Sequence, residues 1–172
     1  TKEVAETEMH AAKRLQEAIR QETGLILPFS VGEVREGDLS LGIAKTLPEQ
    51  TYEITIDEKG GQISGGDGAG VLYGVETFCQ IVQQCGGILP CVQIQDAPDM
   101  PNRGYYFDQT RGRVLKLEEL KKIADRMSHY KLNQLQLYVE HTYLFRDFSE
   151  MWRDQTPITA ASRIQLPVRQ WR

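Results

Sequence analysis

Hydrophobic residues recur every three or four positions near the start of the chain and every second position further along. The first pattern predicts a helix over residues 3–22, with one apolar stripe made of Val4, Ala11, Ala12, Leu15, Ala18 and Ile19. Gly24 is placed to end that helix, and residues 25–27 before Pro28 predict a short strand. Strict alternation over 39–43 and 52–56 predicts two strands, each packing one face on a helix layer.

A turn and a glycine-rich segment shape the middle of the chain. Residues 58–61 predict a turn and 62–64 its returning strand, so a hairpin is expected. Glycines crowd residues 65–70, and an apolar helical stripe follows over 71–82. Such a turn can hold a phosphate at a helix N-terminus, but the motifs of phosphate loops are missing. Close packing of the helix on a strand is therefore the favoured explanation.

The pattern changes after a short strand at 91–94 and a proline-containing connector at 96–101. Strand, helix and strand are predicted over 104–107, 117–130 and 135–139, which indicates a parallel βαβ unit. Ligands of parallel α/β folds bind beyond the carboxyl ends of the strands. In this chain those ends carry residues 108–113 and 140–143, a mixture of carboxylate, guanidinium, imidazole and aromatic groups.

Two alternatives stay open for each candidate at this edge. Asp108 either accepts hydrogen bonds from sugar hydroxyls or pairs structurally with Arg111 or Arg113. His141 beside Glu140 is either a proton-transfer pair or a non-catalytic pair at the rim, because neighbouring strand residues point to opposite faces.

Composition and charge narrow the class of protein. The 172 residues carry a net charge of −4, with −8 over residues 1–98 and +4 over 99–172, so the two parts differ and no general nucleic-acid binder is indicated. The mean hydropathy is −0.44 and no run of about 18 apolar residues occurs, so no membrane helix is expected. Residues 1–6 lack the apolar core of a secretory signal, and a cytoplasmic and an exported parent both stay open.

Cysteines and histidines are few. Three cysteines without C-x-x-C spacing support neither a disulfide framework nor a zinc site. The three histidines show no ligand spacing, so neither a metal nor a cofactor is expected.

Several runs carry a family likeness. Residues 66–80, 89–90 and 92–98 resemble the small α+β domain that precedes the barrel in glycoside hydrolase family 20, and residues 101–108 with Arg111 resemble its first barrel strand. Residues 130–138 resemble the second strand. The resemblance implies an α+β domain over 1–98, with an antiparallel sheet and helices on one face. The first two βα units of a (β/α)8 TIM barrel would follow over 99–160, before a tail at 161–172 that is unlike the family.

The same resemblance implies a retaining β-N-acetylhexosaminidase acting on glycans that contain N-acetylhexosamine. In that family the substrate's 2-acetamido oxygen attacks the anomeric carbon, one carboxylate orients the acetamido group, and a Glu is the general acid/base. Arg103 matches the family arginine that hydrogen-bonds the terminal sugar, with a structural arginine at the domain junction as the alternative. The expected substrate contacts are therefore Arg103, Asp108, Glu140 and His141.

Two departures qualify the expected activity. Glu140, His141 and Thr142 stand where many members have two acidic residues, and the His-x-Gly-Gly motif that precedes the catalytic Asp-Glu pair is absent. A complete barrel needs about 250 residues, so the chain is expected to be a truncated, inactive fragment with no catalytic residue of its own. The tail at 161–172 is either foreign to the family or a divergent terminus.

Other classes of protein stay open. The chain could be a non-catalytic carbohydrate- or protein-binding module that self-associates through an open sheet edge. It could also be the accessory domain of a family 84 hexosaminidase or an α-glucuronidase. Against family 84, residues 104–108 read Gly-Tyr-Tyr-Phe-Asp where that family has Glu-Gly-Phe-Tyr-Gly.

Overall fold

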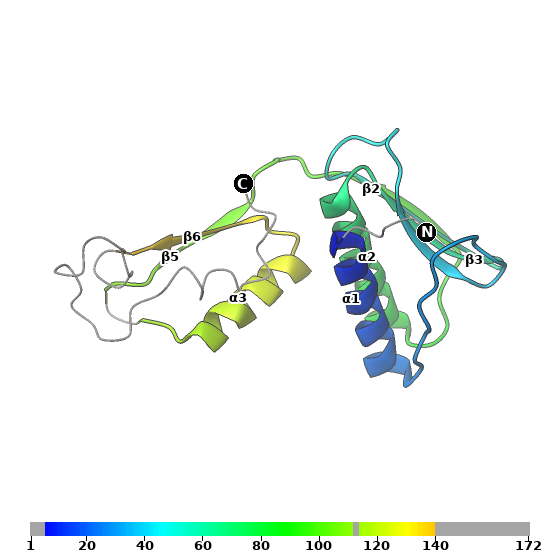
Figure 1. Cartoon of the computed structure of the whole chain (residues 1–172), viewed down its shortest axis with the longest axis horizontal. Coiled ribbons are helices and arrows are strands. Elements are labelled where there is room, and N and C mark those ends of the chain that lie inside the picture. The colour runs from blue at the N-terminus through cyan, green and yellow to red at the C-terminus, as the bar shows by residue number, and fades with distance from the viewer. Residues whose placement is uncertain (1–5, 112–113, 140–172) are drawn as a thin grey trace. The chain divides into compact units, whose positions relative to one another are not determined.

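The computed structural model describes residues 6–111 and 114–139 of the chain (Figure 1). The chain divides into two compact units, Thr1–Pro101 and Asn102–Arg172, each of which is described by itself. The predicted domain ranges 1–98, 99–160 and 161–172 stay predictions, since the last of them lies outside the described residues.

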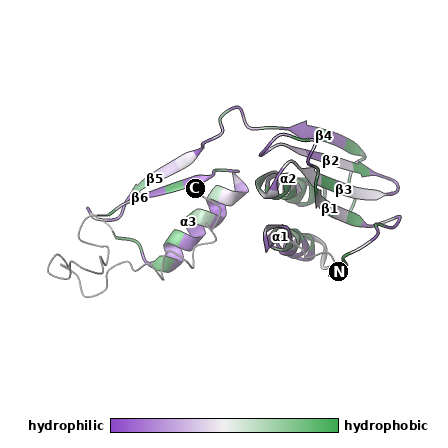
Figure 2. Cartoon of the chain, turned by 45° about the horizontal axis from the view of Figure 1, so that its top comes forward, coloured by the Kyte–Doolittle hydropathy of each residue, from purple (hydrophilic) through white to green (hydrophobic). Residues whose placement is uncertain are grey.

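The first unit is an α+β layer. Its elements in chain order are α1 (Glu6–Thr23), β1 (Leu39–Ile43), β2 (Tyr52–Asp57), β3 (Gly60–Gly65), α2 (Gly68–Cys85) and β4 (Val92–Asp96). The four strands form one sheet in the order β1-β3-β2-β4. Both helices lie on the same side of this sheet (Figure 2).

The expectation of a purely antiparallel sheet is wrong for one strand pair. Strand β2 pairs antiparallel with both β3 and β4, but β1 pairs parallel with β3, Leu41 lying opposite Ile63. The hairpin brings β3 back between β1 and β2, so β3 runs in the direction of β1. The sheet is therefore mixed.

The predicted strand at residues 25–27 is also wrong. The helix ends where Gly24 takes a φ of +75°, as predicted, and the following segment is not a strand in the structure. Leu25 and Ile26 are 60% and 72% exposed, while the side-chain amide of Gln16 donates to the carbonyl oxygen of Leu27. An apolar triplet therefore lies on the surface, outside the sheet.

The core of the first unit lies between the sheet and the two helices. Strand β2 buries Tyr52, Ile54 and Ile56 and turns the residues between them outward, which confirms the predicted alternation. Helix α1 buries most of its predicted stripe, although Ala12 is only partly buried and Val4 lies outside the described residues, and α2 is the more deeply buried helix. The core residues of the two helices are Ala11, Leu15, Ala18, Ile19, Val71, Tyr73, Val75, Phe78, Cys79 and Val82.

Glycines bring α2 close to the sheet. A Cβ atom built on Gly74 would lie 2.6 Å from Cγ2 of Ile63 and 3.3 Å from Cδ2 of Tyr52. A Cβ atom on Gly70 would overlap the carbonyl oxygen of Thr51. The glycine-rich segment therefore serves helix-on-sheet packing, which was the favoured explanation from the sequence.

The second unit contains a parallel βαβ arrangement. Its described elements are β5 (Gly104–Asp108), α3 (Leu117–His129) and β6 (Gln134–Tyr138). The two strands pair in parallel from Gly104↔Gln134 to Asp108↔Tyr138. Helix α3 connects them and buries Leu120, Ala124 and Met127. The predicted strand, helix and strand are confirmed to within about one residue at each end.

Candidate functional site

The candidate site lies where β5 and β6 end. Asp108 is the last residue of β5, and its Oδ1 atom accepts the backbone N–H groups of Thr110 at 2.8 Å and Arg111 at 3.0 Å. Hydrogen bonds from these N–H groups, that of Arg111 first, hold the pKa of Asp108 below its ordinary value. Asp108 therefore shapes the turn that leaves the strand and stays a carboxylate.

Arg111 follows this turn and lies against Tyr138. The Cζ atom of its guanidinium is 5.3 Å from the centroid of the Tyr138 ring, and Nη2 donates to the Tyr138 hydroxyl at 3.3 Å. The ring centroids of Tyr138 and Tyr106 are 6.2 Å apart. Since Tyr106 and Asp108 are two residues apart on β5 and Asp108 is opposite Tyr138, all three share one face of the strand pair.

Arg103 lies at the other end of β5. Its Nε atom donates to the carbonyl oxygen of Lys131 at 3.0 Å, and its backbone N–H donates to Oδ1 of Asn133 at 2.7 Å. The Arg103 carbonyl oxygen in turn accepts the backbone N–H of Gln134 at 3.0 Å. These bonds tie the start of β5 to the start of β6, so Arg103 and Arg111 occupy opposite ends of the strand pair.

The other two predicted contacts, Glu140 and His141, lie outside the described residues. Arg103 and Asp108 are separated by the length of β5. The structure instead groups Asp108 with Arg111, Tyr106 and Tyr138. Sequence reasoning placed Arg111 at this edge but did not anticipate its contact with Tyr138, which the parallel register of the two strands would have suggested.

One buried residue at the same edge was missed altogether. Gln109 has no exposed surface, although it directly follows the strand and precedes the turn residues. Its position in a polar run, residues 108–113, hid its burial.

The glycine-rich turn before α2 holds a carboxylate. Oδ1 of Asp67 accepts the backbone N–H of Gly70 at 2.7 Å and that of Gln50 at 3.0 Å. Asp67 is thus the N-cap of α2 and occupies the place where a phosphate would bind. A second anion at this helix terminus would be repelled by the carboxylate.

The described residues hold neither a metal cluster nor a membrane-spanning helix. Within the described ranges, no three His, Cys, Asp or Glu side chains are grouped so that they could hold a metal ion. None of the helices there is both long and apolar enough to cross a bilayer.

Comparison with known proteins defines the class. Residues 2–97 match the family model described as glycosyl hydrolase family 20, domain 2. This match covers more than half of the chain, and the chain belongs to glycosyl hydrolase family 20. Its first unit is the small α+β domain of that family.

Individual relatives agree with this assignment. A β-hexosaminidase of Porphyromonas gingivalis is 30% identical over 154 residues, which are 83% of this chain and 19% of that protein. Two solved structures share the fold. The β-N-acetylhexosaminidase from Streptomyces coelicolor has a TM-score of 0.76 at 20% identity, over 92% of this chain and 36% of that one. A mutant β-hexosaminidase from Streptomyces plicatus, in complex with its product GlcNAc, has a TM-score of 0.69 at 24% identity, over 80% and 29%. The chain spans about a fifth of the length of its curated relatives.

Proposed function

We propose that this chain is part of a β-N-acetylhexosaminidase that releases terminal N-acetylhexosamine from glycans with retention of configuration. The observation that carries the proposal is the match of residues 2–97 to family 20, together with relatives that are themselves β-hexosaminidases. In the proposed reaction the substrate's acetamido oxygen attacks the anomeric carbon, so that the enzyme supplies an orienting carboxylate and a Glu acid/base.

The second unit would be the opening of the catalytic barrel. Parallel, in-register strands joined by a helix that packs on them are the repeating unit of a (β/α)8 barrel. In that fold the catalytic edge is the one at which Asp108 and Tyr138 end their strands. This geometry supports a substrate edge that carries Arg111.

The edge has the chemistry of a sugar site. A guanidinium presents several N–H donors in a planar fork, which suits neighbouring hydroxyl oxygens, and tyrosine rings stack on the apolar face of a pyranose. Arg111 and Tyr138 supply both groups within one contact. We therefore propose Arg111 as the guanidinium nearest the sugar. The role of Arg103 as a sugar contact stays a prediction, and its hydrogen bond to the Lys131 carbonyl oxygen supports a structural role.

Catalysis by these 172 residues alone is not expected. No His-x-Gly-Gly motif occurs in the sequence. The dipeptide Asp57-Glu58 belongs to the first unit, where Asp57 ends β2 and Glu58 begins the turn to β3. We therefore propose that the chain supplies part of the sugar-binding edge and that the acid/base pair lies elsewhere in a longer protein.

The test has a binding arm and a turnover arm. Saturation-transfer NMR of the chain with GlcNAc should show transfer to the acetamido methyl group. Arg111→Ala should abolish that transfer and Arg103→Ala should retain it if the fold is intact by circular dichroism. Transfer that is lost in Arg103→Ala and retained in Arg111→Ala would assign the sugar contact to Arg103 instead. Release of p-nitrophenol from p-nitrophenyl N-acetyl-β-glucosaminide by the pure chain would contradict the proposed inactivity. A chain that binds no GlcNAc and self-associates in light scattering would instead favour the non-catalytic binding module.

A further inference from the structure

Gln109 is fully buried at the end of β5. Its backbone N–H donates to the carbonyl oxygen of Tyr138 at 2.9 Å, which is a hydrogen bond of the last strand pair, Asp108↔Tyr138. Gln109 directly follows the last residue of β5, next to the edge on which Arg111 and Tyr138 meet.

The amide group of Gln109 makes one specific bond. Oε1 accepts the backbone N–H of Leu115 at 2.8 Å, whereas Nε2 is buried and has no hydrogen-bond acceptor in the part of the chain that the structure describes. The N–H of Leu115 is a donor, so it fixes which end of the amide is oxygen. The side chain thus holds the far end of the loop that leaves β5.

Asp108 and Gln109 hold this loop at both of its ends. Asp108 accepts the N–H groups of Thr110 and Arg111 just after the strand, and Gln109 accepts the N–H of Leu115 two residues before α3 begins. Arg111 lies between these two anchors. The guanidinium of Arg111 contacts the ring of Tyr138.

A residue that served stability alone would have an apolar side chain at this position. An unpaired amide N–H donor buried away from water lowers stability, and an apolar side chain of the same length would avoid that loss. A residue that lowers stability and packs no better than an apolar one is expected where the geometry of a functional edge has to be maintained. The hydrogen bond to Leu115 is the feature that only a side chain with an acceptor can supply here.

We infer that Gln109 is a positioning residue that, by holding the Leu115 N–H beside the end of β5, keeps Arg111 against Tyr138. The inference rests on the proposed function only in giving Arg111 a sugar to bind. The coupling between Gln109 and Arg111 is a property of the chain itself and is measurable without any ligand.

The test compares three variants of the whole chain by NMR and thermal unfolding. Gln109→Met keeps the length of the side chain and removes the acceptor, Gln109→Glu keeps an oxygen acceptor, and Gln93→Met makes the same change at an exposed position of β4. In Gln109→Met the Leu115 amide should exchange with solvent about tenfold faster. The ring-current shift of the Arg111 side-chain protons from Tyr138 should disappear, while the melting temperature stays at or above that of the parent chain.

The two controls separate positioning from folding. Gln109→Glu should restore the Arg111 shift and slow Leu115 exchange, and Gln93→Met should change neither. An unchanged Arg111 shift in folded Gln109→Met would overturn the inference. If Gln109→Met does not fold, loss of the shift in folded Gln109→Glu, which retains the acceptor, would overturn it too.

Failure of the inference and failure of the proposed function give different results. A parent chain that shows the Arg111 shift but no GlcNAc transfer contradicts only the sugar contact. GlcNAc transfer that persists in Gln109→Met with an unchanged Arg111 shift contradicts only the positioning role.

Discussion

The guanidinium of Arg14 on α1 forms two hydrogen bonds to the fully buried carboxylate of Glu76 on α2. Nε lies 3.0 Å from Oε1 and Nη2 lies 3.4 Å from Oε2. The Arg14 side chain is 39% exposed, whereas that of Glu76 has no exposed surface. The ion pair therefore joins the two helices at one edge of the core, with its basic partner half in water.

Removing the basic partner should destabilise the first unit. Arg14→Ala leaves the Glu76 carboxylate buried beside Cys79 with its main counter-charge gone, a change that typically costs 3–5 kcal/mol for a buried pair. Since Arg14 is partly solvated, we expect a loss of roughly 2–3 kcal/mol in the free energy of unfolding, measured by urea denaturation.

A surface ion pair on the same helix is the matched control. Arg20→Ala removes a pair with Glu17 in which both side chains are about half exposed, and it should lower the free energy of unfolding much less than Arg14→Ala does. Equal losses in the two variants would show that burial of Glu76 does not matter.

A methyl group at Gly74 should be too large for the space between α2 and the sheet. The new Cβ atom would lie 2.6 Å from Cγ2 of Ile63, so strand or helix must shift. Gly74→Ala should therefore lower stability by about 1–3 kcal/mol despite the better helix propensity of alanine. Gly87→Ala is the control, because a Cβ atom there meets nothing within 4 Å. A neutral Gly74→Ala would contradict the close packing.

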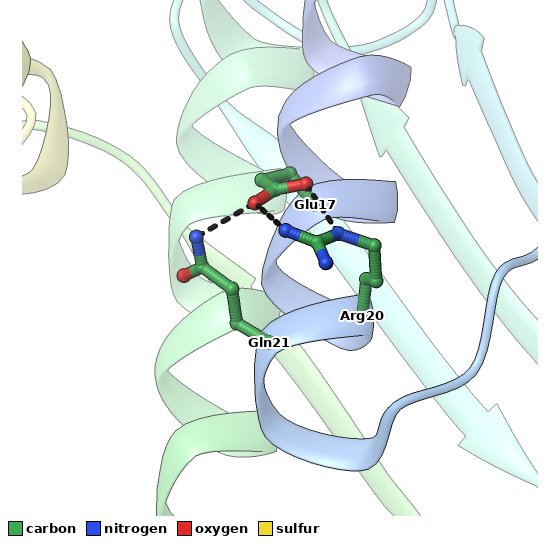
Figure 3. Close-up of polar contacts among 3 residues, drawn as sticks. All are labelled: Glu17, Arg20 and Gln21. Atoms are coloured by element: carbon green, nitrogen blue, oxygen red, sulfur yellow. Dashed lines mark hydrogen bonds and ion pairs between the residues drawn. The ribbon is translucent and has the colours of Figure 1, made fainter.

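The acidity of Glu17 should depend on Arg20. Figure 3 shows that the Glu17 carboxylate accepts hydrogen bonds from Arg20 and Gln21. Nε of Arg20 donates to Oε2 at 2.8 Å, and Nη2 donates to Oε1 at 2.7 Å. These bonds, that of Arg20 first, lower the pKa of Glu17 from 4.5 to about 2. In Arg20→Gln the pKa should rise toward 4.5, measured by carbon NMR of the carboxyl group.

The direction of the pH effect follows from the lowered pKa. The folded chain binds the Glu17 proton less readily than the unfolded chain, so the stabilisation is fully present above about pH 4.5 and is lost as the pH falls toward 2. Because Glu17 is exposed, the effect on stability should be small and should weaken further in salt. Arg35→Gln, elsewhere on the surface, should leave the titration of Glu17 unchanged.

The three cysteines should differ in reactivity. Cys79 is buried in the core, and burial raises the pKa of its thiol to about 12, with a smaller contribution from the charge of Glu76. Cys85 and Cys91 are exposed. A maleimide should therefore label two thiols in the native chain and a third only after denaturation, as counted by mass spectrometry. Rapid labelling of Cys79 in the native chain would contradict its place in the core.

The helices and strands were predictable where burial follows a regular period. The alternation in β2 and the stripe of α1 each state which face is buried, and the structure agrees at Ile54 and Leu15. Strand order carries no such signal. The parallel pairing of β1 with β3 depends on where the hairpin returns, and the apolar triplet after Gly24 mimics a strand that has no place in the sheet.

The candidate site was predictable in position more than in its contacts. The rule that ligands bind beyond the carboxyl ends of parallel strands pointed to the edge that carries Asp108 and Arg111, and a sugar site at this edge stays a prediction. The burial of Gln109 was not predictable, because it stands in a polar run that gives no periodic signal, and that of Glu76 was not, because a carboxylate within an apolar helical stripe needs a partner that the sequence does not reveal; the structure pairs Gln109 with Leu115 and Glu76 with Arg14.

The strand order of the first unit also determines how late in synthesis its sheet can be completed. The β2–β3 hairpin pairs residues that are close in the chain, but Tyr52 pairs with Asp96, which is translated 44 residues later. Long-range pairing is the slow part of sheet formation. On the ribosome the sheet thus stays one strand short, with the β2 edge open, until β4 emerges. This interval is when a nascent chain of this family domain most needs protection by a chaperone.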